Sequence, residues 1–89
     1  MDLTEEFKEA YPEDPLLPFL GSDEKYKEED GIHTYDGFVY VPKKLRRKII
    51  ELHHNGTDAG HRGIEATIER ITRTYYFPAI RKEVRGFIQ

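Results

Sequence analysis

The sequence has no cysteine and no tryptophan, and it has only one serine. Without cysteine the chain holds no disulfide, no thiolate nucleophile and no complete zinc site of a cysteine-containing kind. No apolar run approaches the roughly 20 residues that a membrane helix needs, and the acidic N-terminus is unlike a signal peptide. The single serine, Ser22, has no partners spaced for a catalytic triad. These absences exclude disulfide-rich, membrane-spanning and serine- or cysteine-nucleophile proteins, and we expect a small soluble domain.

The length of 89 residues sets a second limit. It allows one small domain, because independent domains usually run from about 50 to 200 residues. A chain of this size buries only roughly 60% of the surface that its unfolded form exposes, so its core is thin. That is too little chain for a typical enzyme fold with an enclosed pocket. We therefore expect a non-catalytic module with no small-molecule substrate.

The formal net charge of −3 combines two unlike parts. Residues 1–30 carry eleven acids and three lysines, a net charge of −8, whereas residues 31–89 carry eleven Lys and Arg and six acids, a net charge of +5. This asymmetry predicts an acidic extension at 1–30 that precedes a basic domain at 31–89. Ordinary variation in a polar surface is the alternative that charge alone leaves open.

The acidic first third predicts short helices. Over residues 3–11 the apolar side chains recur at i, i+4 and i+8, at Leu3, Phe7 and Tyr11. Thr4 is the candidate N-cap of this helix. Prolines punctuate residues 12–21, which predict one or two helical turns. These turns would pack four apolar side chains onto the rest of the domain: Leu16, Leu17, Phe19 and Leu20. Residues 23–30 predict a charged connector.

A β-hairpin is predicted next. The pair Asp36-Gly37 lies between two short runs with β propensity, 32–35 and 38–41. Asp-Gly is among the preferred pairs for a two-residue hairpin turn, because both of its residues adopt positive φ readily. Pro42 ends the second strand, since it has no N–H to donate to a sheet.

Beyond the hairpin the hydrophobic period becomes helical. A first helix carries Leu45, Ile49 and Leu52, and Asn55-Gly56 should end it. A loop follows, in which Gly60 and Gly63 predict tight or positive-φ backbone. A second helix carries Ile64, Ile68, Ile71 and Tyr75. Pro78 ends it and opens a third helix that carries Ile80, Val84, Phe87 and Ile88. The predicted fold class is α+β, mainly α, with a hairpin and an N-terminal helical extension packed on a three-helix, helix-turn-helix-like bundle.

Three of the four histidines lie within nine residues, as His53, His54 and His61. Imidazole is the commonest neutral nitrogen ligand of zinc, and a histidine at a helix end can converge with one beyond a glycine loop. Two histidines cannot complete a structural zinc site, which normally takes four ligands. The alternative is that these are surface histidines at a helix C-terminus, where the helix dipole favours a cation.

Basic side chains surround the second and third predicted helices. They are Arg62, Arg70, Arg73, Arg81, Lys82 and Arg85, with Tyr75, Tyr76 and Phe77 among them. Such a surface can contact nucleic-acid phosphates through salt-sensitive attraction. The alternative is that the cations form the polar faces of amphipathic helices while the aromatic rings belong to the core.

Residues 36–89 together resemble a known family. The segment has a hairpin that ends in Val-Pro, a helix that ends in His, the loop AGHRGIEAT, the aromatic YYFP and the final RKEVRGFI. This combination is similar to the N-terminal HHCC zinc-binding domain of retroviral and gypsy-type LTR-retrotransposon integrases. The segment LTEEFKEAYPEDPLLPFL is similar, more weakly, to the extension that precedes this domain in such integrases. Phe77 stands where the family usually has Trp, and Ala66 where a basic residue is common.

The resemblance implies a zinc ligand set. The first-histidine position falls on His54, with His53 as the competing choice, and the second falls on His61. The family's two cysteine ligands would lie just beyond Gln89. The resemblance therefore implies a zinc half-site that would not bind the metal tightly by itself, in either a piece of a longer protein or a degenerate copy.

The resemblance also implies a role. The domain would bind the element's DNA ends through the six basic residues named above and would take part in integrase self-association, in the nucleus. The strand-transfer chemistry would belong to a separate core domain of a Gag-Pol polyprotein. The alternative is a protein-interaction module from a domesticated or decayed integrase, without DNA or zinc binding. The acidic first third favours this alternative, because it repels phosphate.

Overall fold

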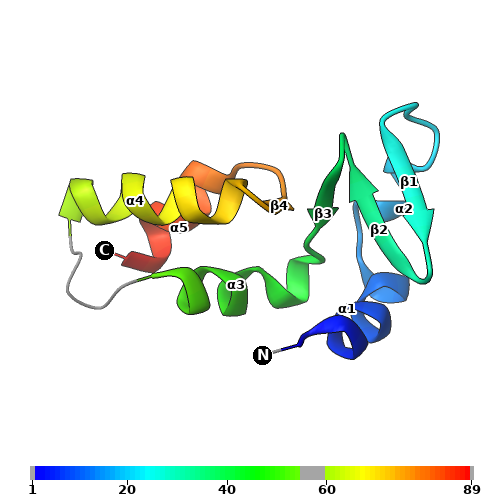
Figure 1. Ribbon diagram of the computed structural model, residues 1–89, viewed down its shortest axis with the longest axis horizontal. Helices are drawn as coiled ribbons and strands as arrows, with labels where there is room; N and C mark the ends of the chain where they lie inside the picture. The colour runs from blue at the N-terminus through cyan, green and yellow to red at the C-terminus, as the bar shows by residue number, and fades with distance from the viewer. Residues whose placement is uncertain (1, 55–59, 89) are drawn as a thin grey trace.

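The computed structural model describes residues 2–54 and 60–88. Its elements are, in order, α1 (Thr4–Ala10), the 3₁₀ turn η1 (Tyr11–Glu13), α2 (Leu17–Leu20), β1 (Tyr26–Glu29), β2 (Ile32–Tyr35), β3 (Phe38–Tyr40), η2 (Lys43–Leu45), α3 (Arg46–His53), α4 (Gly60–Thr72), β4 (Tyr75–Tyr76) and α5 (Ile80–Ile88). Helices α3, α4 and α5 form a bundle at one end of an elongated molecule, and α1, α2, β1 and β2 lie at the other (Figure 1). The predicted class, α+β and mainly α, is confirmed.

The N-terminal helix forms where its apolar stripe predicts it. Leu3 and Phe7 are buried on one side of α1, and the Tyr11 ring follows them into the core. Thr4 is not the N-cap: Leu3 occupies that position, and the Asp2 carboxylate accepts the Thr4 N–H at 2.9 Å. Asp2, the residue before the N-cap position, therefore accepts a hydrogen bond from a backbone N–H of the first turn.

The proline-rich segment forms two short helical turns, as predicted. Both η1 and α2 have proline in their first turn, where the missing N–H costs nothing. Leu16, Leu17 and Leu20 pack at the edge of the core. Phe19 does not: 75% of it is exposed, so the prediction that it packs inward is wrong.

The predicted connector at 23–30 is wrong in its second half, because Tyr26–Glu29 forms β1. This strand pairs antiparallel with β2, and β2 pairs antiparallel with β3. Both connections are Asp-Gly turns in which each residue has positive φ: Asp30 (52°) and Gly31 (83°), then Asp36 (54°) and Gly37 (88°). The second turn confirms the predicted hairpin, and the first is a hairpin of the same kind.

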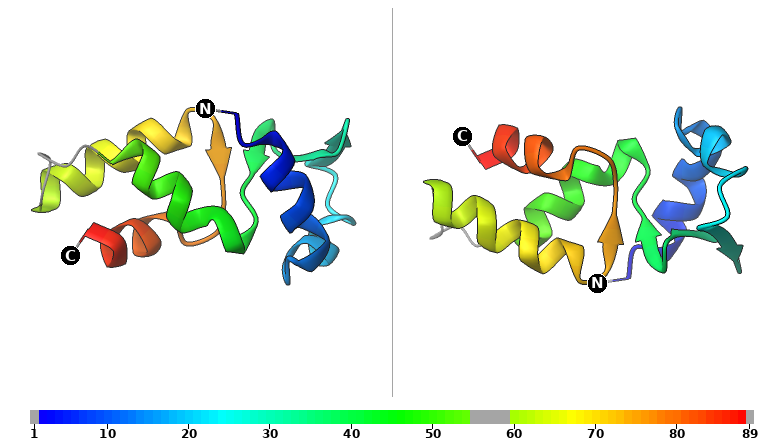
Figure 2. Two further views of the ribbon diagram at one scale, coloured as in Figure 1. Left: turned by 90° about the horizontal axis from the view of Figure 1, so that it is seen from below. Right: turned by 90° about the horizontal axis from the view of Figure 1, so that it is seen from above.

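A two-residue strand links the sheet to the bundle. Tyr75 and Tyr76 form β4, which pairs parallel with β3 in the registers Val39↔Tyr75 and Tyr40↔Tyr76 and completes a sheet of order β1-β2-β3-β4. The prediction that Tyr75 continues the second helix is therefore wrong. Helix α4 ends at Thr72 because the chain then turns to add to the edge of β3 (Figure 2).

The three bundle helices form as predicted, with shifts at their ends. In α3 the buried apolar residues are Ile49 and Ile50, whereas Leu52, predicted on the apolar face, is 47% exposed. Helix α4 begins at Gly60, so both Gly60 and Gly63 are helical, where a loop with tight or positive-φ backbone was predicted. The predicted stop at residues 55–56 lies outside the described residues.

One hydrophobic core spans the molecule. Its fully buried side chains come from the sheet, from all three bundle helices and from the segment after β4: Tyr40, Val41, Ile49, Ile71, Phe77 and Val84. Phe7 and Tyr11 of the acidic extension belong to the same cluster, so the core crosses the boundary predicted at residue 30. In the part of the chain that the structure describes, no helix is long and apolar enough to cross a membrane.

Candidate metal site and basic surface

Two adjacent histidines lie at the C-terminal end of α3 and have different environments. The Nδ1 atom of His53 lies 2.7 Å from the carbonyl oxygen of Ile49, one turn earlier. Because a carbonyl only accepts, this nitrogen carries the proton. The His53 ring also packs edge-on against Tyr75, with a centroid separation of 5.5 Å. His53 is therefore already engaged within the fold through Nδ1.

The ring of His54 points into the bundle and is not satisfied. Its Nδ1 atom is buried and has no hydrogen-bond partner among the residues that the structure describes. The ring meets Phe87 of α5 edge-on, at 6.2 Å between centroids and 81° between planes. A buried polar nitrogen without a partner costs about 1–3 kcal/mol, and coordination to a metal ion would satisfy it. This orphaned nitrogen fits zinc ligation by His54, while His53, whose Nδ1–H donates to a carbonyl, still has Nε2 for a metal and stays the alternative.

The backbone of His61 lies in the first turn of α4, directly after Gly60. Its side chain lies outside the described residues, so its predicted role as second ligand stays a prediction. Among the described residues, no group of three or more histidine, aspartate or glutamate side chains could hold a metal ion. Of the two predicted zinc ligands, the structure therefore describes only the side chain of His54, and its unsatisfied Nδ1 is compatible with binding a metal.

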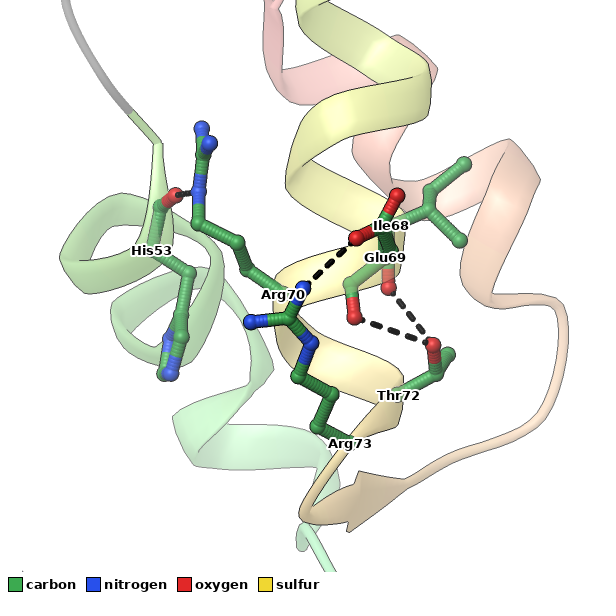
Figure 3. A network of polar contacts seen from close by, with 6 residues as sticks. All are labelled: His53, Ile68, Glu69, Arg70, Thr72 and Arg73. Atoms are coloured by element: carbon green, nitrogen blue, oxygen red, sulfur yellow. Dashed lines mark hydrogen bonds and ion pairs between the residues drawn. The ribbon is translucent and has the colours of Figure 1, made fainter.

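Three of the six predicted DNA-binding cations are engaged inside the protein. Arg70 of α4 donates from Nε to the backbone carbonyl of His53 at 2.8 Å and so links α4 to the end of α3 (Figure 3). Arg73 forms an exposed ion pair with Glu69 at 2.6 Å. Arg81 of α5 pairs with Glu65 of α4. Both glutamates of α4 are thus paired with arginines that lie outside the helix.

The positive charge of the bundle lies on α3 and α5 instead. Residues 43–53 carry five cations and one acid, a net charge of +4, and residues 80–88 carry three cations and one acid, a net charge of +2. The remaining predicted cations, Arg62, Lys82 and Arg85, are exposed. Within the described residues no ion pair involves Lys82 or Arg85.

An open groove of about 430 Å³ separates these two basic helices. The cations Arg47 of α3 and Lys82 of α5 line it. Its lining also includes the apolar side chains of Ile50 and Phe87 and the carboxylate of Glu83. The Arg47 guanidinium lies 5.6 Å from the centre of the Phe87 ring, a cation–π contact that orients it. We call this feature the α3/α5 groove. The ring of Phe87 thus lies between His54 and Arg47.

Sequence reasoning left three cations of this surface out of the predicted site: Lys43, Lys44 and Arg47. All three are exposed. The basic run KKLRRK at residues 43–48 could have indicated these three cations. Within it, however, Arg46 is buried and Lys48 pairs with Glu6 at 2.9 Å, so the run by itself does not identify the exposed cations.

The aromatic residues among the predicted cations are buried to different degrees, Phe77 fully and Tyr75 and Tyr76 in part. Phe77 is 1% exposed, and the buried Arg46 guanidinium lies 5.5 Å from its ring centre. Tyr76 stacks on Tyr35 of β2 at 4.9 Å between centroids. The alternative stated above, that the aromatic rings belong to the core, is confirmed for Phe77. The ring of Phe77 is therefore not available as a platform for nucleic-acid bases.

The family described as the integrase zinc binding domain matches residues 41–89, more than half of the chain. The matched segment begins at the end of β3 and contains α3, α4, β4 and α5, and therefore both the candidate histidines and the α3/α5 groove. No curated protein matches the chain significantly. From this match over more than half its length, the chain belongs to the integrase zinc-binding domain family, a non-catalytic module.

Proposed function

We propose that the protein acts in the nucleus as the N-terminal domain of a retrotransposon integrase, where it binds the element's DNA ends and takes part in integrase self-association. Membership of the zinc-binding domain family supports the integrase part of this proposal. Strand transfer would be carried out by a separate domain of the parent polyprotein. The role of this domain is to hold DNA and neighbouring subunits in place.

The observation that carries DNA binding is the placement of unpaired cations on both sides of the α3/α5 groove. Arg47 and Lys82 face it from opposite helices, and neither forms an ion pair within the described residues. Cations that are already paired inside the protein gain little from a phosphate, whereas exposed unpaired ones gain the full attraction and release counterions. We therefore assign DNA contact to the unpaired cations of α3 and α5, in place of the engaged Arg70, Arg73 and Arg81.

This assignment is tested by fluorescence anisotropy with a duplex of about 25 base pairs, at salt concentrations from about 50 to 200 mM. Replacing Arg47 and Lys82 by glutamine should weaken binding roughly tenfold and reduce the salt slope by about 1.8, since each lost phosphate contact removes about 0.9. The matched control replaces Arg73 and Arg81, which removes the same charge from paired positions and should change affinity less than twofold. Equal losses in the two variants would refute the assignment.

For zinc, we propose that His54 and His61 supply the histidine half of the ligand set. A metal at this position would cross-link the end of α3 to the start of α4. The full structural site needs two further ligands, which this sequence does not contain as cysteines. We propose that the bundle folds without metal, because its core is continuous from Phe7 to Val84.

Thermal unfolding tests both statements about zinc. Added zinc should raise Tm in the wild type and in His53→Ala but not in His54→Ala, because among the described side chains only His54 has an unsatisfied buried nitrogen. A chelator should leave the wild-type Tm unchanged. A large loss of stability with chelator would contradict metal-independent folding, and a zinc response that requires His53 would reverse the assignment.

One observation favours a second candidate function, a protein-interaction module that binds neither DNA nor zinc. Residues 1–30 carry a net charge of −8, which repels phosphate. The same anisotropy titration separates the two functions. Negligible affinity for duplex DNA at about 50 mM salt would leave protein interaction as the function.

A further inference from the structure

Strand β1 forms one edge of the sheet. The strand order is β1-β2-β3-β4, so within the described residues β1 has a hydrogen-bonded neighbour on one side only. It lies at the end of the molecule away from the three-helix bundle (Figure 1). Of its four residues, Lys27, Glu28 and Glu29 are exposed and Tyr26 is half-buried. A free edge of this kind is a template for another extended chain.

The register shows which backbone groups of β1 face outward. The Asp36 N–H donates to the Lys25 carbonyl at 2.9 Å, and hydrogen-bonded pairs alternate with non-hydrogen-bonded pairs along an antiparallel ladder. Lys25 and Lys27 therefore direct their backbone groups toward β2. Tyr26 and Glu28, which lie at the alternate positions, direct their N–H and carbonyl groups away from β2, toward the open edge.

Only part of this outward-facing backbone is already used. The Tyr26 N–H donates to the Asp23 carbonyl at 3.0 Å. The Glu28 carboxylate accepts the Gly31 N–H at 3.2 Å, so its side chain turns back toward the hairpin turn. Among the described residues this leaves the Tyr26 carbonyl and both backbone groups of Glu28 for a partner. A residue that can donate and accept on the same side is the repeating unit of strand pairing, so this edge can hold a further strand.

The surroundings of this edge are acidic. Residues 23–30, which contain β1, carry five acids and two lysines, a net charge of −3. They belong to residues 1–42, which carry twelve acids and three lysines, a net charge of −9. Neither Glu28 nor Glu29 forms an ion pair within the described residues. The edge therefore attracts a cationic chain and repels an acidic one.

The charges of β1 also disfavour pairing with β1 of a second copy. A two-fold antiparallel pair places one residue directly opposite itself. Centred on Glu28, such a pair sets two carboxylates opposite each other, and centred on Lys27 it sets two ammonium groups opposite each other. Like charges in these positions destabilise a strand pair, and charged side chains commonly protect natural edges from self-pairing. The occupant that fits is a chain of different, basic sequence.

We propose that the edge of β1 binds an extended, lysine- or arginine-rich segment of another protein, which adds to the sheet as a fifth strand. Glu28 supplies a backbone donor and acceptor, and Tyr26 supplies a second acceptor. Basic side chains of the segment lie beside Glu28 on one face of the sheet and beside Glu29 on the other, because successive side chains alternate. In strand addition, main-chain hydrogen bonds provide affinity and side chains provide specificity.

This inference goes beyond the proposed function. It uses the end of the molecule opposite the α3/α5 groove, and it needs neither DNA nor zinc.

Amide NMR of the ¹⁵N-labelled 89-residue protein tests the proposal with an acetylated and amidated peptide of alternating lysine and valine, about seven residues long, at up to about 1 mM and at about 50 mM salt. At saturation the Glu28 amide proton should shift downfield and exchange with solvent at least about fivefold more slowly, because it gains an acceptor. The Lys27 amide, which already faces β2, should change less than about twofold. A Glu28 amide that does not respond would overturn the proposal.

Two matched peptides separate strand addition from general attraction. The same peptide with every backbone amide N-methylated keeps its charge and side chains but cannot donate a hydrogen bond, and it should not protect Glu28. A peptide with glutamate in place of lysine keeps the backbone but should not bind. Equal protection by the N-methylated peptide, or equal binding of the glutamate peptide, would overturn the proposal.

A pair of double variants locates the charges that matter. Glu28→Gln with Glu29→Gln removes both β1 carboxylates, while an amide oxygen can still accept the Gly31 N–H, and it should raise the peptide Kd at least about fivefold. The control, Glu5→Gln with Glu9→Gln, removes the same charge from exposed positions on α1 and should change Kd less than about twofold. With all proteins folded by circular dichroism, equal losses would mean that net charge governs binding and would overturn the proposal.

Other occupants of the edge are outcomes of the same measurements. A Glu28 amide whose protection rises with protein concentration, without peptide, would assign the edge to a second copy. Duplex DNA that protects the Glu28 amide would assign it to nucleic acid. Either result would overturn the proposal. Protection by the lysine peptide in a protein without DNA affinity would refute the DNA-binding proposal and leave this one standing.

Discussion

The hydroxyl of Tyr40 donates a 2.6 Å hydrogen bond to Oδ2 of Asp14, twenty-six residues earlier in the chain. The same hydroxyl accepts a 2.9 Å hydrogen bond from Nη2 of Arg46, which also donates from Nε to the Val41 carbonyl. The second Asp14 oxygen accepts the N–H of Lys43 at 2.6 Å. All three side chains are buried. This network joins the acidic extension, the sheet and the start of the bundle, so the extension is part of one cooperative unit.

Replacing Asp14 by asparagine should lower the free energy of unfolding by about 1–3 kcal/mol, because it removes charge-assisted hydrogen bonds from a buried network. The control is Glu13→Gln, the same chemical change at the neighbouring exposed residue, which should stay within about 0.5 kcal/mol of wild type. Urea unfolding followed by circular dichroism measures both. Equal effects of the two substitutions would show that the network does not stabilise the fold.

Asp14 should also make the free energy of unfolding fall at acidic pH. Burial by itself raises the pKa of Asp14, but the Tyr40 hydroxyl and the N–H groups of Lys43 and Leu17 lower it, aided by the charge of Arg46. The net effect holds the pKa of Asp14 below its ordinary value of 3.8. The folded state then binds fewer protons than the unfolded chain, so this stabilisation is complete above about pH 4 and is lost as the pH falls through the lowered pKa.

Urea unfolding at several pH values between about 6 and 2.5 should therefore show a stability gap between wild type and Asp14→Asn that narrows as the pH falls. The variant lacks the titrating carboxylate and should lose less stability over this range. A gap that stays constant with pH would mean that Asp14 titrates alike in the folded and unfolded states.

A second pH dependence is expected from His33 on β2. Its ring packs edge-on against Tyr11 at 4.3 Å, its Nδ1 shares a hydrogen bond with the Tyr26 hydroxyl, and Lys8 lines the same hollow. Burial lowers the pKa of His33 below 6.5, although Glu28 opposite it on β1 acts to raise it. The folded state thus resists protonation, and stability should decline as the pH falls below about 6.5.

Replacing His33 by glutamine removes this titration while keeping a polar side chain on the strand. The decline in unfolding free energy between pH 7 and about 5.5 should be shallower in His33→Gln than in the wild type. An unchanged slope would show that His33 titrates alike in the folded and unfolded states.

Two glycines should respond to alanine with opposite signs. Gly37 has a φ of 88° in the hairpin turn, a conformation that costs an L-residue about 1–2 kcal/mol, so Gly37→Ala should destabilise by about that amount. Gly86 lies within α5, and a Cβ there meets nothing within 4 Å. Gly86→Ala should therefore stabilise by about 0.5–1 kcal/mol. Thermal unfolding of both variants checks the pair, and two shifts of the same sign would contradict it.

Local patterns were sufficient for much of the fold. The hairpin at Asp36-Gly37 was predictable because the turn requires residues that tolerate positive φ, and that requirement is local. The bundle helices were predictable because burial of one helix face imposes a period close to four residues. The first hairpin has the same turn signal at Asp30-Gly31. Its strand Tyr26–Glu29 was not predicted because the residues are mostly polar, and an exposed edge strand needs no alternation of apolar and polar side chains.

Other features depended on partners distant in sequence. Tyr75 continues the helical period, yet it leaves the helix because the edge of β3 is there to pair with. Leu52 matched the apolar pattern but is exposed, because the packing partners of α3 lie toward Ile49 and Ile50. The pattern of a single helix cannot show which part of its apolar face another element covers.

For the candidate site too, some features were predictable from the sequence and others depended on the tertiary structure. The sequence by itself determined that this chain holds clustered histidines, no cysteine, a segregated charge and the motifs of an integrase zinc-binding domain, because composition and short spacings are properties of the covalent chain. Only the tertiary structure showed that His54, beside Phe87, has an imidazole nitrogen without a hydrogen-bond partner among the described residues, because that depends on contacts between helices. Only the tertiary structure showed which cations are exposed and unpaired, because pairing is set by distances between helices that the order of residues does not contain.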